Sequence, residues 1–405
     1  MQTTLRDYLV VTGGYWAFTI TDGAIRMLVV LYFHLLGYSP FEVAMLFLFY
    51  EFFGVVTNLV GGWLGARIGL NRTMHMGMGL QVLALLMLTV PEAWLSVAYV
   101  MFAQALSGIA KDLNKMSAKA SVKSLAASAD DSRLFRLVAV LTGSKNALKG
   151  AGYFMGGGLL QWIGFQGALW VLAMTLLLVL FVTMGLLPDG VGRMKSKARF
   201  SRVFSNRSEI NWLSLARFFL FAARDVWFVV GLPVYLYSML GWSFTEVGGF
   251  LAVWIIGYGV VQAIAPDLLR AGRKDAVPGG RAAVVWGLVL CLVPAGIALG
   301  MESSIDASLW IIAGLIAFAL VFAMNSALHS FLILAYSDAD SVAMNVGFYY
   351  MANAAGRLTG TVLSGLVYQY QGLAGCLWWS TALVVVAALV SLRLPAARKS
   401  TVQTS

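Results

Sequence analysis

The stretch SKNALKGAGYFMGGG, from Ser144 to Gly158, places two lysines and five glycines inside a long apolar segment. Lys145 and Lys149 are four residues apart, so in a helix they lie on the same face. A lysine at the centre of a membrane costs about 2.5–3.5 kcal/mol on insertion scales, so such residues usually face a cavity, a partner or a ligand. Two lysines on one face indicate an anionic ligand. The glycines allow a neighbouring helix to approach closely.

The composition around this stretch is that of a protein with many membrane-spanning helices. Of the 405 residues, 60% are hydrophobic and 11% are charged, which is far from the balance of a soluble globular domain. Runs long enough to cross about 30 Å of hydrocarbon predict twelve spans. They lie near residues 14–36, 42–66, 73–91, 94–113, 136–160, 167–187, 211–238, 246–269, 282–300, 309–335, 343–367 and 373–394. We therefore expect an all-α, polytopic membrane protein.

Basic residues are distributed unevenly between the predicted loops. The turns after odd-numbered spans contain no lysine or arginine, whereas the turns after even-numbered spans are rich in both. Because loops rich in lysine and arginine stay on the cytoplasmic side, we expect an inner-membrane protein with both termini in the cytoplasm. The net charge of +10 is explained by this topology, and no nucleic-acid partner is expected.

The chain also divides into two similar halves. The predicted parts are a six-helix bundle at 1–187, a basic cytoplasmic linker at 188–210, a second six-helix bundle at 211–394 and a cytoplasmic tail at 395–405. LGYSPFEV (Leu36–Val43) and LGWSFTEV (Leu240–Val247) stand 204 residues apart. The same offset relates Gly152 to Gly356, Gly156 to Gly360 and Lys149 to Asn353. Chance similarity of short turns is the alternative to a duplicated unit whose repeats rock around a site at the middle of the membrane.

Charged residues inside the predicted spans are the main candidates for function. Besides the two lysines they are Asp22, Arg26, Glu51, Lys111, Asp112, Lys115, Arg217, Arg224, Asp225 and Arg357. Cations outnumber carboxylates by about two to one in this set, so ion pairing leaves positive charge for a polyanionic ligand. Guanidinium groups bind oxyanions bidentately, and lysines bind them as point charges.

Several of these charges have competing interpretations. Asp22 and Arg26 are spaced i, i+4, so an internal salt bridge and a ligand role for Arg26 are equally open. Arg217 is within two turns of the predicted cytoplasmic end of its span and is interpreted as an anchor. Arg224 and Asp225 are adjacent, hence about 100° apart on a helix, and are not expected to share a face. One of these two is then available to reach across to the first span.

Few residues of the predicted spans could carry protons or bind a metal. His329, in the polar run MNSALHS, is a candidate substrate contact or proton carrier, although packing is the commoner role. Asp22, Glu51 and Asp225 are candidates for proton coupling or for structural ion pairs, because carboxylates at low dielectric can exchange protons near neutral pH. The histidines and the two cysteines show no metal-ligand spacing, so neither a metal nor a cofactor is predicted.

Two short motifs resemble those of the major facilitator superfamily. GGWLGARIGLNRT (residues 61–73) is similar to the GxLaDRxGrr loop of the superfamily, with matches at Gly62, Leu64, Arg67, Gly69 and Arg72. Ala66 stands where the family has an aspartate, so the charge contact of that residue is expected to be absent or replaced. The fifth span resembles the glycine-rich antiporter motif through Gly152, Gly156 and Gly157 but lacks its proline. The helices that line the cavity in such folds favour Arg26, Lys145, Lys149, Arg224 and Arg357; Lys111, Asn353 and His329 complete the candidate substrate contacts.

Longer segments resemble a narrower family. TDGAIRMLVVLYFHLLGYSP (21–40), LFLFYEFFGVVTNLVGGWLGARIGLNRT (46–73), ALSGIAKDLNKMSAK (105–119), LTGSKNALKG (141–150) and ARDVWFVVGLPVYL (223–236) are similar to the ArsJ-type organoarsenical efflux permeases. The similarity covers most of the chain. It implies export of 1-arseno-3-phosphoglycerate, which a glyceraldehyde-3-phosphate dehydrogenase makes from arsenate, and hence arsenate resistance with that enzyme as functional partner.

The expected mechanism is alternating access by a monomeric carrier. Lys145 and Lys149 are expected to hold one end of the anion, and Arg224 and Arg357 the other. An organophosphate/phosphate antiporter and a general organic-anion or multidrug efflux permease are the alternatives. No nucleophile, metal-ligand or phosphate-loop motif favours an enzyme.

Overall fold

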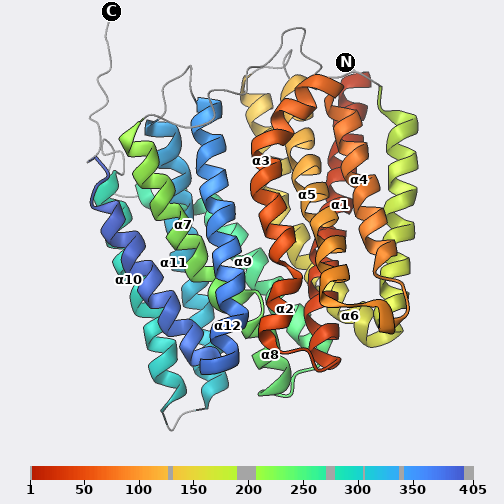
Figure 1. Ribbon diagram of the computed structural model, residues 1–405. Helices are drawn as coiled ribbons and strands as arrows, with labels where there is room; N and C mark the ends of the chain where they lie inside the picture. The colour runs from red at the N-terminus through yellow and green to blue at the C-terminus, as the bar shows by residue number, and fades with distance from the viewer. Residues whose placement is uncertain are drawn as a thin grey trace, which may run out of the picture. The chain divides into compact units, whose positions relative to one another are not determined.

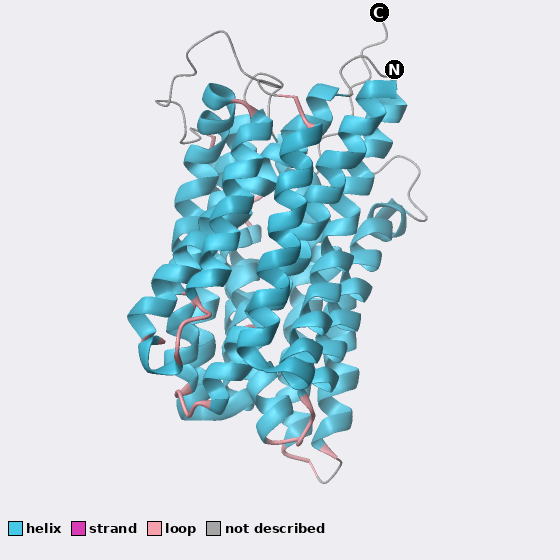
Figure 2. Cartoon of the chain, turned by 90° about the vertical axis from the view of Figure 1, so that its right-hand side faces the viewer, coloured by secondary structure: helices cyan, strands magenta, loops and turns pink. Residues whose placement is uncertain are grey.

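A computed structural model describes residues 2–125, 131–188, 207–270, 279–303, 306–336 and 342–395. These residues form helices and short loops, with no strand among them (Figure 2). The helices are α1 (Gln2–Leu35), α2 (Pro40–Leu46), α3 (Leu48–Ile68), α4 (Leu70–Met87), the 3₁₀ turn η1 (Glu92–Trp94), α5 (Val97–Leu125), α6 (Asp131–Leu186), α7 (Ser208–Phe228), α8 (Gly231–Ser238), α9 (Phe244–Arg270), α10 (Gly280–Met301), α11 (Ala307–Tyr336) and α12 (Val342–Ser391) (Figure 1).

The helices have the length and composition of membrane spans. Eight helical stretches of the described chain are long and apolar enough to cross a membrane. Two of them are double length, and each contains a glycine with positive φ, Gly164 (71°) in α6 and Gly372 (64°) in α12. Both glycines lie at predicted turns, so each long helix accounts for two predicted spans. The predicted all-α, polytopic membrane fold is confirmed.

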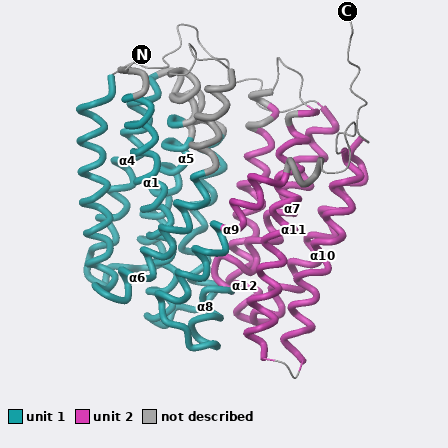
Figure 3. Tube along the Cα trace, turned by 180° about the vertical axis from the view of Figure 1, so that it is seen from behind, with its two compact units in different colours: residues 1–201, 232–256 teal, residues 202–231, 257–405 magenta. Residues whose placement is uncertain are grey.

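The chain forms two compact units (Figure 3). The first comprises residues 1–201 and 232–256, and the second comprises residues 202–231 and 257–405. The segment 232–256, which contains α8 and the first half of α9, therefore belongs to the first unit. The predicted linker lies mostly outside the described residues, and the predicted domain boundaries stay predictions.

Backbone-to-backbone packing joins α1 to α6 in the first unit. A Cβ atom at Gly152 would collide with the carbonyl oxygen of Ile20, and a Cβ atom at Gly156 would lie 2.5 Å from the carbonyl oxygen of Ala24. Real Cβ atoms do not approach this closely, so only glycine permits this separation of the two helices.

The second unit repeats this arrangement. A Cβ atom at Gly356 of α12 would collide with the carbonyl oxygen of Phe218, and one at Gly360 would lie 2.8 Å from that of Ala222. The α12 glycines are offset by 204 residues from those of α6, and their α7 partners by 198 residues from those of α1. The α1-to-α7 offset places Arg224 at the position that corresponds to Arg26.

The two similar turns found in the sequence also have the same geometry. Ser39 starts α2 with a capping box in which its N–H and Oγ–H donate to Glu42 Oε2, both at 2.8 Å. Ser243 N–H and Oγ–H donate to Glu246 Oε2 at 2.7 and 2.8 Å. The repetition therefore extends from residue identity to hydrogen bonding.

A break between α7 and α8 interrupts what the sequence predicts as one span. The backbone N–H groups of Val230 and Gly231 both donate to Ser364 Oγ of α12, each at 3.1 Å. In a lipid environment backbone polar groups need internal partners, and the Ser364 hydroxyl supplies one for this break. The break coincides with the end of the second unit's first segment, at residue 231.

Candidate functional site

A buried ion pair joins α1 to α3 in the first unit. Arg26 Nη2 lies 2.5 Å from Glu51 Oε1, and the two side chains are 5% and 1% exposed. The guanidinium carbon is 5.3 Å from the centre of the Phe47 ring and 5.0 Å from that of Tyr50. Arg26 is thus held by a carboxylate and two aromatic rings, which together stabilise a cation at low dielectric.

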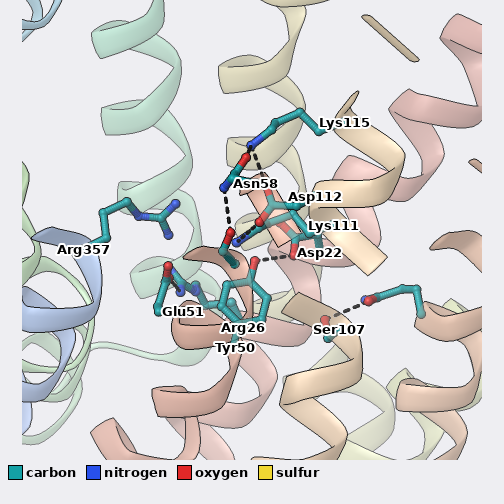
Figure 4. Close-up of polar contacts among 12 residues, drawn as sticks. Asp22, Arg26, Tyr50, Glu51, Asn58, Ser107, Lys111, Asp112, Lys115 and Arg357 are labelled. Atoms are coloured by element: carbon teal, nitrogen blue, oxygen red, sulfur yellow. Dashed lines mark hydrogen bonds and ion pairs between the residues drawn. The ribbon is translucent and has the colours of Figure 1, made fainter. Parts of the chain in front are cut away.

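Tyr50 connects this ion pair to the neighbouring charges (Figure 4). Its hydroxyl donates to Asp22 Oδ1 at 2.6 Å, and Lys111 Nζ lies 4.0 Å from the centre of its ring. The internal Asp22–Arg26 salt bridge considered from the sequence is therefore not the observed arrangement. Arg26 pairs with α3, and Asp22 accepts a hydrogen bond from α3.

The lysines of α5 share one carboxylate. Asp112 Oδ1 lies 2.5 Å from Lys115 Nζ, and Asp112 Oδ2 lies 3.7 Å from Lys111 Nζ. Lys115 Nζ also donates to Asn58 Oδ1 of α3 at 3.0 Å. A Cβ atom at Gly54 would lie 3.1 Å from Asp112 Oδ2, so glycine at this position lets the carboxylate approach α3. We call Asp22, Arg26, Tyr50, Glu51, Asn58, Lys111, Asp112 and Lys115 the first charge cluster.

The lysine pair of the sequence lies on α6, which packs against α1. Lys145 and Lys149 are both half-buried, and Lys149 Nζ lies 5.6 Å from the centre of the Tyr153 ring. The backbone of Lys149 borders α1, since a Cβ atom at Gly23 would be 2.7 Å from its carbonyl oxygen. The two lysines therefore add positive charge on a face of α6 that is anchored to α1.

The second unit contains a smaller group, which we call the second charge cluster. On α7, Asp225 Oδ1 lies 2.5 Å from Arg224 Nη2. Asp225 Oδ2 lies 3.3 Å from Nε of Arg357 in α12. Asp225 is fully buried, whereas the side chains of Arg224 and Arg357 are 15% and 18% exposed. Arg224 and Asp225 were not expected to share a helix face, yet their side chains form an ion pair, because the long arginine side chain spans the angle between the two positions.

Arg217 also departs from the sequence interpretation. It was expected to be an anchor at the membrane surface, but it is only 4% exposed. Its Nη1 donates to the carbonyl oxygen of Ser326 at 3.2 Å, and its guanidinium carbon lies 4.0 Å from the centre of the Phe221 ring. Neighbouring helices bury this side chain, so it does not extend to the lipid headgroups.

The remaining candidates take varied positions. His329 is buried on α11 (2% exposed), and Asn353 is half-buried on α12, one turn before Arg357. Gly69 precedes α4 with a φ of 99°, and Arg72 is exposed. The side chains of residues 59–67, which include the motif positions 62 and 67, lie outside the described residues. Gly157 packs against the carbonyl oxygen of Phe244 in α9.

Sequence reasoning missed the uncharged members of the first charge cluster. Tyr50 contacts three charged residues of that cluster, and Asn58 links α3 to α5. Tyr50 was detectable as the neighbour of Glu51. Asn58 is two helical turns beyond Glu51 and so on nearly the same face.

Comparison with known proteins identifies the family to which this fold belongs. The family model described as Major Facilitator Superfamily matches residues 11–324. The chain belongs to this superfamily. Its members are membrane transporters, and the predicted resemblance to this superfamily is confirmed. The roles expected of the motif residues stay predictions. No curated protein matches the chain.

Solved structures of superfamily transporters have the same fold. A nucleoside transporter, NupG in a mutant form, matches with a TM-score of 0.71 at 12% identity, covering 96% of this chain and 97% of that one. A proton-dependent oligopeptide transporter matches with a TM-score of 0.69 at 16% identity, covering 96% of both chains. A bacterial homologue of the human drug peptide transporters PepT1 and PepT2 matches with 0.67 at 15%, covering 96% and 97%. At these identities the similarity establishes the fold alone.

Proposed function

We propose that this superfamily member exports an organic oxyanion by alternating access, with 1-arseno-3-phosphoglycerate as the substrate. The observation that carries the proposal is the charge balance of the buried side chains. Among the charged candidates of the described spans, the first unit has five cations and three carboxylates: Arg26, Lys111, Lys115, Lys145 and Lys149 against Asp22, Glu51 and Asp112. In the second unit one carboxylate, Asp225, serves both Arg224 and Arg357.

This distribution assigns different roles to the two groups of cations. Arg26 is enclosed by Glu51, Phe47 and Tyr50, which favours a structural role for it. In the first unit the proposed substrate contacts are Lys145 and Lys149, and in the second unit Arg224 and Arg357. Each of these four side chains retains some exposure, which a residue that binds and releases a ligand requires.

The choice among oxyanions rests on the resemblance to the ArsJ-type permeases together with the chemistry of the site. A phosphate and an arsenate ester are hard oxyanions that suit guanidinium and ammonium groups. An arsenite carrier would favour clustered thiols, but Cys291 and Cys376 lie on different helices and are free. An inside-negative potential favours the exit of a polyanion by about 2.3 kcal/mol per charge per 100 mV, so export needs no proton coupling.

The proposal also implies a membrane topology and a functional partner enzyme. An exporter of a cytoplasmic metabolite would lie in the inner membrane, and the lysine- and arginine-rich loops support a cytoplasmic location for both termini. The glyceraldehyde-3-phosphate dehydrogenase that makes the conjugate would be a functional partner without binding the carrier, which we expect to act as a monomer.

The first test uses cells that lack other arsenic exporters. The gene is expressed with and without a glyceraldehyde-3-phosphate dehydrogenase, and survival in arsenate and cellular arsenic are measured. Resistance with low cellular arsenic should require both proteins. If the carrier changes neither quantity in the presence of the enzyme, the proposed substrate is wrong.

A variant then tests the lysine face. Lys149→Gln should abolish resistance while membrane abundance stays at the level of the unmodified protein, because a neutral amide cannot replace the charge that attracts the anion. Arg281→Gln, which removes the same charge from an exposed side chain at the start of α10, is the matched control. Retained resistance in Lys149→Gln would exclude this lysine from the site.

The alternative function is exchange of an organophosphate for phosphate, which the same cations favour. Proteoliposomes loaded with phosphate distinguish the two mechanisms. Strict dependence of substrate uptake on internal phosphate would establish exchange, whereas uptake driven by membrane potential alone supports uniport.

A further inference from the structure

A buried arginine of the second unit is left without a carboxylate by the described part of the chain. Arg217 has one hydrogen bond there, from Nη1 to the carbonyl oxygen of Ser326, and its guanidinium packs between the rings of Phe221 and Tyr349. The Nη1 contact leaves the edge formed by Nε and Nη2. This is the edge that binds oxyanions bidentately.

Other buried polar atoms close to Arg217 also lack a partner. Arg217 Nε, Ser214 Oγ and His329 Nδ1 are enclosed and make no hydrogen bond within the described residues. Ser214 precedes Arg217 by one turn on α7, and His329 follows Ser326, whose carbonyl oxygen binds Arg217, by one turn on α11. Buried polar atoms are rarely left unsatisfied, so three of them on neighbouring turns of α7 and α11 need an explanation.

All three groups can donate a hydrogen bond. A guanidinium Nε and a hydroxyl are donors, and a histidine Nδ1 is a donor in one of its tautomers. A ligand that satisfies them must therefore be an acceptor at each point and carry negative charge opposite Arg217. A tetrahedral oxyanion meets both requirements.

The surroundings hold the site in place. Ser326 Oγ accepts hydrogen bonds from the Tyr258 hydroxyl at 3.2 Å and from Gln262 Nε2 at 3.3 Å. These contacts fix α9 against α11 next to the carbonyl oxygen that orients Arg217. Asp225 lies two turns further along α7 and is already engaged by Arg224 and Arg357.

We propose that Ser214, Arg217 and His329 form a second anion site inside the second unit, which binds a small inorganic oxyanion such as phosphate or sulfate. The site is separate from the second charge cluster and does not depend on the identity of the exported substrate. The competing interpretation is that Arg217 is a structural strut, held only by the Ser326 carbonyl group and the two aromatic rings.

The test measures oxyanion binding by the full-length protein in lipid nanodiscs, in a gluconate buffer. Labelled phosphate is titrated into Lys149→Gln protein, which removes one of the four proposed substrate contacts and leaves Ser214, Arg217 and His329 unchanged. Saturable binding that sulfate displaces and chloride does not is the expected result. Arg217→Gln added to this background should raise the Kd at least about tenfold, the effect of losing a charged hydrogen-bonding partner. Arg393→Gln, on an exposed side chain of the same unit, should leave the Kd unchanged.

The outcomes separate the two interpretations. Absence of phosphate binding in the Lys149→Gln protein, or equal binding after Arg217→Gln, would overturn the proposal and leave Arg217 as a strut. If Arg217→Gln does not fold, Ser214→Ala and His329→Phe decide the question, because each removes one donor. Each should weaken binding severalfold, and unchanged binding in both would reject the site. Failure of export in cells does not affect this measurement, so the two proposals fail independently.

Discussion

Replacing one partner of the Arg26–Glu51 pair should destabilise the protein far more than replacing both. In Glu51→Leu the guanidinium of Arg26 stays buried between Phe47 and Tyr50 without its carboxylate. In the double variant Arg26→Met, Glu51→Leu, two apolar side chains of similar length fill the same space. The difference between these variants measures the ion pair itself.

The magnitude follows from the burial and the distance. The two side chains are 5% and 1% exposed, and their nearest atoms are 2.5 Å apart. With charge centres separated by about 4 Å and an effective dielectric of about 20, the attraction is about 4 kcal/mol. Loss of one partner of a buried pair costs about 3–5 kcal/mol, whereas replacing the whole pair by apolar side chains of similar volume is often neutral or stabilising.

The assay is a double-mutant cycle on purified protein in detergent. The free energy of unfolding is measured by denaturant titration for the unmodified protein, the two single variants and the double variant. We expect each single variant to lose about 3–5 kcal/mol and the double variant to recover most of it, with a coupling energy of at least about 2 kcal/mol. Arg6→Met is the control, because the Arg6 side chain, which pairs with Asp7, is 55% exposed, and an ion pair of a solvent-exposed side chain is worth less than about 1 kcal/mol.

Additive single effects would refute this reasoning, because they would show that Arg26 and Glu51 act independently. Transport by the double variant adds a second readout. If its stability recovers but transport does not, one of the two residues has a role in the transport cycle beyond the ion pair.

Three further predictions concern packing and hydrogen bonds. Gly156→Val should lower the yield of folded protein in size-exclusion chromatography, because a Cβ atom there would lie 2.5 Å from the Ala24 carbonyl oxygen. Overpacking of this kind costs about 1–3 kcal/mol. Gly79→Val is the control and should keep a near-normal yield, because a Cβ atom there meets nothing within 4 Å. Ser364→Ala should speed amide hydrogen exchange at Val230 and Gly231, because their N–H groups lose their acceptor. Leaving buried donors without an acceptor costs about 1–3 kcal/mol of stability. Ser391→Ala is the control and should leave that exchange unchanged, because the Ser391 hydroxyl donates to a carbonyl oxygen of its own helix. Ser243→Ala should lower the free energy of unfolding by about 1 kcal/mol through loss of its capping box, and an unchanged value would show that the cap is dispensable.

Much of the fold was predictable because its causes are local. Long apolar runs specify spans, and the glycines at 164 and 372 lie where the sequence predicts turns within the two longest helices. The repeated motif at Ser39 and Ser243 was visible because a capping box needs only four consecutive residues. The break between α7 and α8 was not predicted, because the acceptor that stabilises it, Ser364, is more than 130 residues away.

The sequence by itself determined that this chain spans a membrane and that its spans carry more cations than carboxylates. These conclusions depend on composition and spacing, which do not change on folding. The tertiary structure decided which charges meet: Arg26 pairs with Glu51 across helices, Asp22 accepts from Tyr50, and Asp225 takes two arginines. Long side chains reach several neighbours, and the rotation and separation of the helices select one of them. Those quantities are set where glycines such as Gly156 and Gly360 let one backbone meet another.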